Sequence, residues 1–573
     1  MMAAIRPPVW TAGPILEAVQ AARLFNDSKD FVDCPLHVDP DECWRRWDEL
    51  QQPVAPAALE AFVASTFGPP GGGLEPWSPP DHTSEPPLLA RLVEPELSWA
   101  RHLNDLWPVL GRRVSAETLA APQRTSLLAA RHGFVIPGGR FREAYYWDSY
   151  WVLLGLLAVG MRTTARSVAD NLLDAVEQYG FVPNGLRSYY LNRSQPPMLT
   201  QMVHALAASL GCPSGPDVDL FDAAEAQPEQ ELELLQRALP LLDKEYNWWM
   251  GEGSISVIHL PAVNGSSQPP AVLNRYAVNE TLPRPESWRE DRETAAGLPA
   301  EEAARLFAQL AAGAETGWDY SSRWLRSDGT GGGSAPPPLQ GIQTSELLAV
   351  DLNSILYKNE KSLAALHSRL AALLPAGSEE SKREGEAAEA YTRAAGARQQ
   401  AMRAYMWDAS SARWHDVLWR SHQKAGELTA AAFTPLWAGL HSAEEAAGAV
   451  ASLRASGLLQ RGGIATSLLA SGQQWDFPNA WPPLQEMLIT GLRECGVPEG
   501  KELALELADL WLASNLKGWV EDGVMHEKYD ATRPGKRGEG GEYVPQVGFG
   551  WTNGVALSLL RRYRGLSGAA TAS

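Results

Sequence analysis

Apolar residues along most of this chain recur three or four positions apart, which is the spacing of one face of an α-helix. Two such series follow one another between residues 146 and 179, and Gly180 then supplies a stop signal. The pattern continues in four further stretches, residues 298–312, 376–406, 446–453 and 502–513. Alternation of apolar and polar positions, which marks a half-buried strand, is scarce. The pattern therefore predicts an all-α protein and disfavours a parallel-sheet fold.

Two loops rich in glycine and proline interrupt the helical pattern, at residues 68–87 and 328–341. Such composition does not support regular structure, so we expect both to be surface excursions. Length alone suggests about four domains of roughly 150 residues. Neither loop is a domain boundary, however, because helical stretches of similar composition continue on both sides. We therefore expect one helical domain, residues 21–566, between an N-terminal arm (1–20) and a flexible tail (567–573).

Acidic residues outnumber basic ones: the 573 residues include 68 Asp and Glu against 49 Lys and Arg, for a net charge of -19. Binding to nucleic acid depends on clustered Lys and Arg that release counterions from the phosphates. This balance therefore excludes nucleic acid as an expected partner. Hydrophobic residues make up 45% of the chain, which is ordinary for a globular protein and sufficient for a large core.

Cysteine usage and the apolar runs bear on the cellular compartment. The four cysteines are scattered, without metal-binding spacing, as is typical of thiols in a reducing compartment: Cys34, Cys43, Cys212 and Cys495. The longest apolar run, residues 151–161, is too short to cross a bilayer, and the N-terminus lacks the apolar stretch of a secretory signal. We expect a cytoplasmic protein with no membrane partner. Four glycosylation sequons leave an extracellular location open, at Asn26, Asn192, Asn264 and Asn279.

Five of the 22 tryptophans are followed by aspartate, where chance placement gives about one such pair. The pairs begin at Trp47, Trp147, Trp318, Trp407 and Trp475. A propeller of Trp-Asp repeats is rejected, because its blades recur every ~40–45 residues. The gaps here run from 68 to 171 residues. The pairs instead suggest a sugar site, where aromatic faces pack on a pyranose ring and carboxylates bind its hydroxyls. The alternative for any single pair is a core tryptophan beside a helix-capping aspartate.

Three regions concentrate aromatic, amide and charged side chains. Residues 137–151 join a Gly-Gly turn to a helix with a polar start and an apolar continuation, which indicates a site at a helix N-terminus. Residues 473–483 (QQWDFPNAWPP) form a second concentration of rings and amides. Near the C-terminus, EKYD at 527–530 precedes GEGGEY at 538–543 and GFGWTNG at 548–554. Together these regions predict a pocket built by loops between helices.

These regions resemble the glycoside hydrolases that cleave trehalose. Residues 137–150 are similar to the first signature of that family, and residues 474–481 are similar to the second. Other segments resemble further family blocks, in the family's order: 24–33, 315–324, 527–530 and 540–554. The matches cover nearly the whole chain. The resemblance implies an (α/α)6 barrel whose long loops form a deep disaccharide pocket.

Hydrolysis of a glycosidic bond needs one carboxylic acid to protonate the leaving oxygen and a carboxylate on the other face of the sugar. The sequence alone offers too many choices among 68 acidic residues. The resemblance implies that Asp319 is the general acid and Glu527 the general base of an inverting enzyme. The neighbouring Trp318 and Tyr320 can desolvate Asp319 and raise its pKa. An inverting pair holds its carboxyl groups about 6.5–9.5 Å apart.

The resemblance also implies a set of substrate-binding residues. Arg140, Trp147 and Asp148 of the first signature are expected to contact sugar hydroxyls, while Phe141 and Trp475 are expected to form walls of the pocket. The other positions that match family binding residues are Asn184, Arg193, Ser194, Gln195, Arg284, Glu286, the Gly317 backbone and Glu542. Arginines suit this role because they donate several hydrogen bonds to hydroxyls and carboxylates. No metal or cofactor is expected, since the HExxH and phosphate-loop spacings are missing.

The leading interpretation is therefore hydrolysis of α,α-trehalose to two glucose molecules, with no obligate protein partner. Another helical-barrel α-glucosidase is one alternative, and activity on maltose but not on trehalose would favour it. A non-catalytic sugar-binding protein is another, and the expected mark of that class is loss of Asp319 or Glu527, both of which are present. One position departs from the family pattern: Glu539 stands where a glycine is frequent, which could stiffen a loop over the pocket.

Overall fold

The computed structural model of the protein describes residues 6–211, 227–261, 271–325 and 338–564. Most of the predicted insert at 328–341 and the predicted tail at 567–573 lie outside the described residues, as do Cys212 and Asn264.

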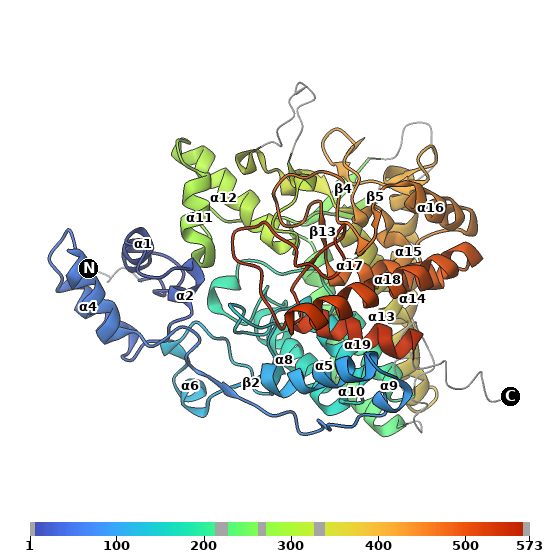
Figure 1. The fold of residues 1–573 in the computed structure, drawn as a ribbon, viewed down its shortest axis with the longest axis horizontal. Coiled ribbons are helices and arrows are strands. Elements are labelled where there is room, and N and C mark those ends of the chain that lie inside the picture. Colours follow the sequence, from blue (N-terminus) through green and yellow to red (C-terminus); the bar gives the residue numbers. More distant parts are fainter. Residues whose placement is uncertain (1–5, 212–226, 262–270, 326–337, 565–573) are drawn as a thin grey trace.

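The body of the molecule is helical (Figure 1), and its long helices form two rings. Six inner helices contact one another in sequence, and the last contacts the first to close the ring: α7 (Asp148–Ala158), α9 (Leu199–Ser209), α13 (Val350–Leu373), α15 (Thr434–Ala438), α17 (Pro482–Glu494) and α19 (Gly550–Tyr563). Six outer helices cover them: α5 (Glu96–Leu110), α8 (Arg162–Tyr179), α10 (Pro228–Met250), α14 (Glu379–Tyr405), α16 (Ala443–Ala455) and α18 (Pro498–Asp522). The predicted all-α, (α/α)6 architecture is confirmed.

Inner and outer helices differ in sequence because they differ in the number of faces that they bury. Every residue of α7 and α9 is buried, so these helices are apolar on all sides. The outer α8 instead buries one stripe of residues, which includes Val168, Leu172 and Val176, and exposes polar residues opposite. Small residues set the closest approach in the inner ring: a Cβ atom on Gly155 of α7 would lie 2.4 Å from the Cα atom of Gly554 in α19.

Short antiparallel strands connect the helices and shape the loops. One sheet has the order β1-β2-β3, from β1 (Leu74–Pro76), β2 (Gly111–Val114) and β3 (Phe134–Val135), and another has the order β10-β9-β6, from β6 (Leu347–Leu348), β9 (Val417–Leu418) and β10 (Gln423–Lys424). The remaining strands form pairs: β4 (Val257–Leu260) with β5 (Ala271–Asn274), β7 (Trp407–Asp408) with β8 (Arg413–Trp414), β11 (Leu459–Gln460) with β12 (Gly463–Ile464), and β13 (Asn479–Ala480) with β14 (Tyr529–Asp530).

The expectation that residues 68–87 hold no regular structure is wrong at one point. Strand β1 lies within this insert and pairs with β2, so that Leu74 stands opposite Val114. The pairing satisfies backbone groups that a loop would leave to solvent, and it places Leu74 against the main core.

The N-terminal part of the chain packs as a separate cluster beside the barrel (Figure 1). We call residues 9–67 the N-terminal unit; its helices are α1 (Pro14–Ala21), α2 (Ser28–Val32), α3 (Pro40–Asp48) and α4 (Pro56–Thr66). Three barrel-side tyrosines complete its hydrophobic cluster: Tyr145, Tyr189 and Tyr190. Helix α1 continues through the predicted boundary between residues 20 and 21. The division of the chain into arm, domain and tail stays a prediction.

Three further helices complete the set: α6 (Ala116–Ala120), α11 (Trp288–Thr294) and α12 (Ala300–Glu315). Helix α12 overlaps the predicted helical stretch 298–312, and it has Pro299 before its first residue and Glu301 and Glu302 in its first turn. Among the described residues, none of the helices combines the length and the apolar character that crossing a membrane requires.

Candidate active site

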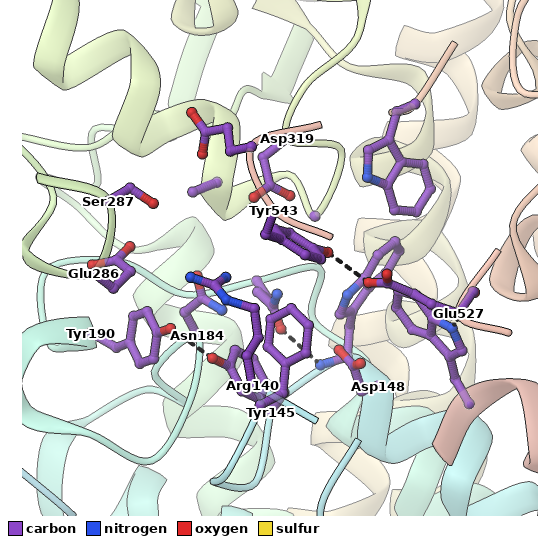
Figure 2. Close-up of a pocket in the computed structure, with 18 of the residues that line it drawn as sticks. Arg140, Tyr145, Asp148, Asn184, Tyr190, Glu286, Ser287, Asp319, Glu527 and Tyr543 are labelled. Atoms are coloured by element: carbon purple, nitrogen blue, oxygen red, sulfur yellow. Dashed lines mark hydrogen bonds between the residues drawn. The ribbon is translucent and has the colours of Figure 1, made fainter. Parts of the chain in front are cut away.

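A cavity lies among the loops at the N-terminal ends of α7, α17 and α19 (Figure 2). All but one of the residues predicted for the site line it: Arg140, Phe141, Trp147, Asp148, Asn184, Arg193, Gln195, Arg284, Glu286, Gly317, Asp319, Trp475, Glu527 and Glu542. The fold therefore gathers residues between Arg140 and Glu542, distant in the sequence, around one cavity.

Ser194 is the exception, because it lies behind the cavity wall. Its hydroxyl donates to the Val182 carbonyl at 2.6 Å, and its backbone N–H donates to the Glu315 carboxylate at 3.1 Å. Both contacts hold the turn that presents Arg193 and Gln195 to the cavity. Ser194 thus supports neighbouring lining residues. It does not line the cavity itself, although it is predicted to contact substrate.

Asp319 follows α12 through a tight turn that only glycine fits. Gly317 has a φ of 73°, and a Cβ atom there would lie 2.6 Å from the Trp147 ring. The carbonyl of Asp319 accepts a hydrogen bond from the Gln474 side chain. Burial raises the pKa of Asp319 to about 6, although the positive charges of Arg284 and Arg193 act in the opposite direction. This carboxyl group can therefore keep its proton at mildly acidic pH.

Glu527 is fully buried, whereas Asp319 is only partly buried, and donors surround the Glu527 carboxyl group. The Tyr543 hydroxyl donates to Oε1 at 2.6 Å, and the Gln546 N–H donates to Oε2 at 3.1 Å. Burial raises the pKa of Glu527, while the adjacent Lys528 ammonium and these hydrogen bonds lower it. Two donors and a neighbouring cation favour the ionised form, which is the form that a base requires. In Figure 2, Asp319 and Glu527 lie on either side of the Tyr543 ring.

Asp148 is a third buried carboxyl group at the cavity, at the first position of α7. Burial raises its pKa well above the usual range, and the negative charges of Glu527 and Asp319 raise it further. A protonated Asp148 can donate one hydrogen bond and accept others, which suits contact with a sugar hydroxyl. Beside it, the Trp147 N–H donates to the Gln195 side chain at 3.2 Å, so the start of α7 is held from across the cavity.

Two buried arginines of the cavity are held by carboxylates. Arg193 donates to Glu286 at 2.6 Å and to the Asn184 side chain at 2.9 Å. Arg284 donates to Asp291 at 2.6 Å and reaches Glu542 at 3.2 Å. Within the described part of the chain, Arg193 Nη1 and Glu286 Oε2 are buried and have no hydrogen-bond partner.

Aromatic rings form one wall as a stack of three indoles. Trp475 lies between Trp318, at a centroid distance of 5.3 Å and 16°, and Trp481, at 4.0 Å and 1°. Cations cover both ends of the stack: the Arg323 guanidinium lies 4.7 Å from the Trp318 ring, and the Lys528 ammonium lies 4.8 Å from the Trp481 ring. Each cation–π contact is worth about 0.5–2 kcal/mol. Because an indole or a cation covers each ring face of the stack, Trp475 and Trp481 line the cavity with ring edges rather than with a free face.

The five Trp-Asp pairs divide between the site and the rest of the molecule. Those at Trp147, Trp318 and Trp475 meet beside the cavity, as the sugar interpretation predicts. Trp47 instead belongs to the cluster of the N-terminal unit, and Trp407 lies in β7 beside Trp414. The capping-and-core alternative was therefore the better description for these two pairs.

Comparison with known proteins bears on what this cavity does. A family model described as Trehalase matches residues 23–564. The trehalase of Oryctolagus cuniculus is 40% identical over 571 residues, covering 98% of this chain and 91% of that protein. The trehalase of Homo sapiens is 38% identical with the same coverage. The chain belongs to the trehalase family.

A solved structure in this family is also similar. The neutral trehalase from Saccharomyces cerevisiae superposes with a TM-score of 0.57 and 29% sequence identity, covering 75% of this chain and 74% of that chain. The trehalase-family fold thus carries the two signatures at the cavity, the first at the start of α7 and the second before α17. Across the described ranges, no group of three or more His, Cys, Asp or Glu is arranged to hold a metal ion.

Sequence reasoning missed several cavity residues of this trehalase-family site: Tyr145, Tyr190, Ser287, Ala314, Trp481, Tyr543, Phe549 and Trp551. A signal existed for most aromatic members, because Tyr145 and Trp481 stand inside the two signatures and Tyr543 directly follows Glu542. No signal existed for Asp476 as a support. Its buried carboxylate accepts from the side chains of Ser321, Ser322, Ser467 and Ser471 and so holds the segment that follows Asp319.

Proposed function

We propose that this protein hydrolyses α,α-trehalose to two glucose molecules with inversion at one anomeric carbon. Membership of the trehalase family supports the substrate. The observation that carries the mechanism is the contrast between the surroundings of two carboxyl groups at one cavity. Asp319 has a pKa raised to about 6, whereas both oxygens of Glu527 accept hydrogen bonds. Such a contrast separates an acid from a base.

Asp319 then protonates the glycosidic oxygen while the bond to one anomeric carbon breaks. Glu527 takes a proton from the water that attacks this carbon from the opposite face. The proton lost by Asp319 and the proton gained by Glu527 balance, and exchange with solvent restores both groups. Arg193 and Glu286, which line the cavity, bind sugar hydroxyls, and the edges of the Trp475 and Trp481 rings bound the space for a sugar ring.

The product anomers test this stereochemistry. Attack with inversion on α,α-trehalose yields one β-glucose and one α-glucose in the first turnover. Retention would yield two α-glucose molecules. Proton NMR of early time points with purified protein distinguishes the two results, and initial release of α-glucose alone would overturn the inverting assignment. Cleavage of maltose in the absence of trehalose cleavage would instead favour another α-glucosidase activity.

Substitution tests the two roles. Asp319→Asn and Glu527→Gln should each lower kcat by about 10²–10⁴-fold, because general acid and general base each contribute on that scale. Sugar binding should persist, measured by calorimetry with trehalose. The matched controls Asp41→Asn and Glu502→Gln change exposed acids and should keep wild-type kcat. Wild-type turnover in either site variant would contradict the assigned role.

The setting of the reaction is also proposed. We place the protein in the cytoplasm, without a nucleic acid, membrane or obligate protein partner. The net charge of -19 supports the first exclusion, and the buried free thiols of Cys34, Cys43 and Cys495 suit a reducing compartment. Cell fractionation followed by trehalose assay of each fraction tests the location.

A further inference from the structure

An ion pair joins the N-terminal unit to the cavity-lining residue Arg140. Asp27 stands at the N-cap of α2, where its Oδ1 accepts the Lys29 N–H at 2.9 Å. The same carboxylate holds Arg140 with a two-pronged contact: Nε to Oδ2 is 2.6 Å, and Nη2 to Oδ1 is 2.7 Å. Such paired contacts fix the plane of a guanidinium group as well as its position. The side chains of Arg140 and Asp27 are 15% and 28% exposed, so solvent screens this pair only partly.

A second set of contacts keeps the N-terminal unit in place. Arg289 of α11 donates to the Phe25 and Asn26 carbonyls, each at 2.8 Å. Its Nε also donates to the Ser28 hydroxyl at 3.0 Å. The backbone on both sides of Asp27 is therefore anchored to the barrel side of the molecule. Asp27 itself is left to act on Arg140.

Arg140 in turn holds the segment 543–546 that covers the cavity. Its guanidinium carbon lies 4.7 Å from the Tyr543 ring centroid, and its backbone N–H donates to the Gln546 side chain at 3.0 Å. The approach is close: Gly139 has a φ of 61°, and a Cβ atom there would lie 1.9 Å from Gln546 Oε1. The left-handed φ favours glycine before Arg140, and the close approach shows that the Gln546 side chain packs directly on this turn.

Tyr543 and Gln546 are the two residues that donate to the carboxyl oxygens of Glu527, at 2.6 and 3.1 Å. We propose that Asp27 is a positioning residue for the base Glu527, acting through the Arg140 guanidinium on Tyr543, whose hydroxyl orients the Glu527 carboxylate. The inference rests on the proposed role of Glu527. Figure 2 shows the later part of the path, with Arg140 beside Tyr543 and the Tyr543 hydroxyl directed at Glu527.

The proposed role of Asp27 predicts a change in the pH dependence of kcat/KM. Without Asp27, Arg140 loses its fixed plane, and the hydrogen bonds to Glu527 weaken. Those bonds favour the ionised carboxylate, so their loss moves the acidic limb of the kcat/KM profile to higher pH. The charged and titratable groups that face Glu527 and remain in place are Lys528, Asp148, Asp319, Arg140 and Tyr543.

Asp27→Asn is the informative variant, because asparagine caps a helix as well as aspartate does but cannot form the charged pair. We expect kcat to fall about 10–100-fold, as small misplacements of catalytic groups do, with the acidic limb shifted upward. Asp48→Asn is the matched control: it breaks an exposed ion pair with Arg6 in the same unit and should change neither quantity. Asp27→Ser, which also keeps a cap, replaces the asparagine variant if that protein does not fold.

A double-mutant cycle with Tyr543→Phe separates this role from a general structural one. If Asp27 acts through Tyr543, the double variant should be within about 2-fold of Tyr543→Phe alone, since the effects of coupled residues do not add. Independent, multiplicative losses overturn the proposal. So does a rise in KM alone, which would mean that Arg140 affects only sugar binding, or a fall in Tm with unchanged kcat and pH profile. Absence of trehalose cleavage in the wild-type protein would refute the proposed function instead.

Discussion

Gln474 joins the two halves of the proposed catalytic pair, and its removal is the sharpest test of the site's construction. The buried side chain donates through Nε2 to the Asp319 carbonyl and accepts through Oε1 from Lys528 Nζ at 2.8 Å. Lys528 is the neighbour of Glu527, so one amide group fixes the acid segment relative to the base segment. Antiparallel pairing of Ala480 with Tyr529, in β13 and β14, brings the segment that follows Gln474 to the base segment.

Gln474→Leu keeps the volume of the side chain and removes both contacts. A neutral hydrogen bond contributes about 0.5–1.5 kcal/mol and one to a charged group about 1.5–3 kcal/mol, for a total of roughly 2–4.5 kcal/mol. Lys528 retains an acceptor, the Gly540 carbonyl at 3.1 Å, which reduces the loss. If about 2 kcal/mol of this reaches the transition state, kcat falls roughly 30-fold. KM should change less than about 3-fold, since Gln474 is not among the cavity-lining residues.

Steady-state trehalose kinetics and urea unfolding measure the two parts of the loss. The neighbouring Gln473→Leu is the matched control, because Gln473 is half-buried and its hydrogen bonds to Asp476 and Ser471 run through its backbone. Gln474→Glu divides the pair of contacts: it keeps an acceptor for Lys528 and loses the donor to Asp319. A Gln474→Leu enzyme with wild-type kcat would refute the idea that this amide positions the catalytic pair.

Two predictions concern pH. The kcat/KM profile on trehalose should be bell-shaped. Its alkaline limb should begin near pH 6, because burial raises the pKa of Asp319 to about 6 and the acid must carry its proton. Its acidic limb should lie above pH 4.5, since burial raises the pKa of Glu527. A profile still rising above pH 8 would contradict this assignment. Burial also raises the pKa of Glu245 to about 7, so the folded state holds a proton that the unfolded state releases from about pH 4.5 upward. The stabilisation from this group is complete below pH 4.5 and is lost as pH rises through about 7. The free energy of unfolding in urea should therefore fall less between pH 5 and 7.5 in Glu245→Gln than in the wild type. An unchanged pH dependence of that free energy would assign the fall to other groups.

The sequence could reveal the part of the site whose functional side chains are concentrated in short segments. Residues 137–150 and 474–481 hold their aromatic, amide and charged side chains within a few positions, and all but one of the predicted residues line the cavity. Ser194 does not line the cavity, because adjacent residues in an extended turn point in opposite directions, one into the cavity and one into the wall. The sugar-site interpretation did not hold for the Trp-Asp pairs at Trp47 and Trp407, because a residue pair carries no information about its location in the fold.

The sequence itself determined the helix content, the absence of a parallel sheet and the helical stretches. The reason is that the spacing of apolar residues is a local property, which each helix repeats. The same holds for the acidic balance and for the signatures that imply trehalose. Only the tertiary structure decided that Asp27, over 100 positions before Arg140 in the chain, holds that residue, and that Gln474 joins Asp319 to Lys528. These contacts depend on how two rings of helices bring distant loops to one cavity. No local pattern records that arrangement, because the free energy that sets it comes from packing over the whole barrel.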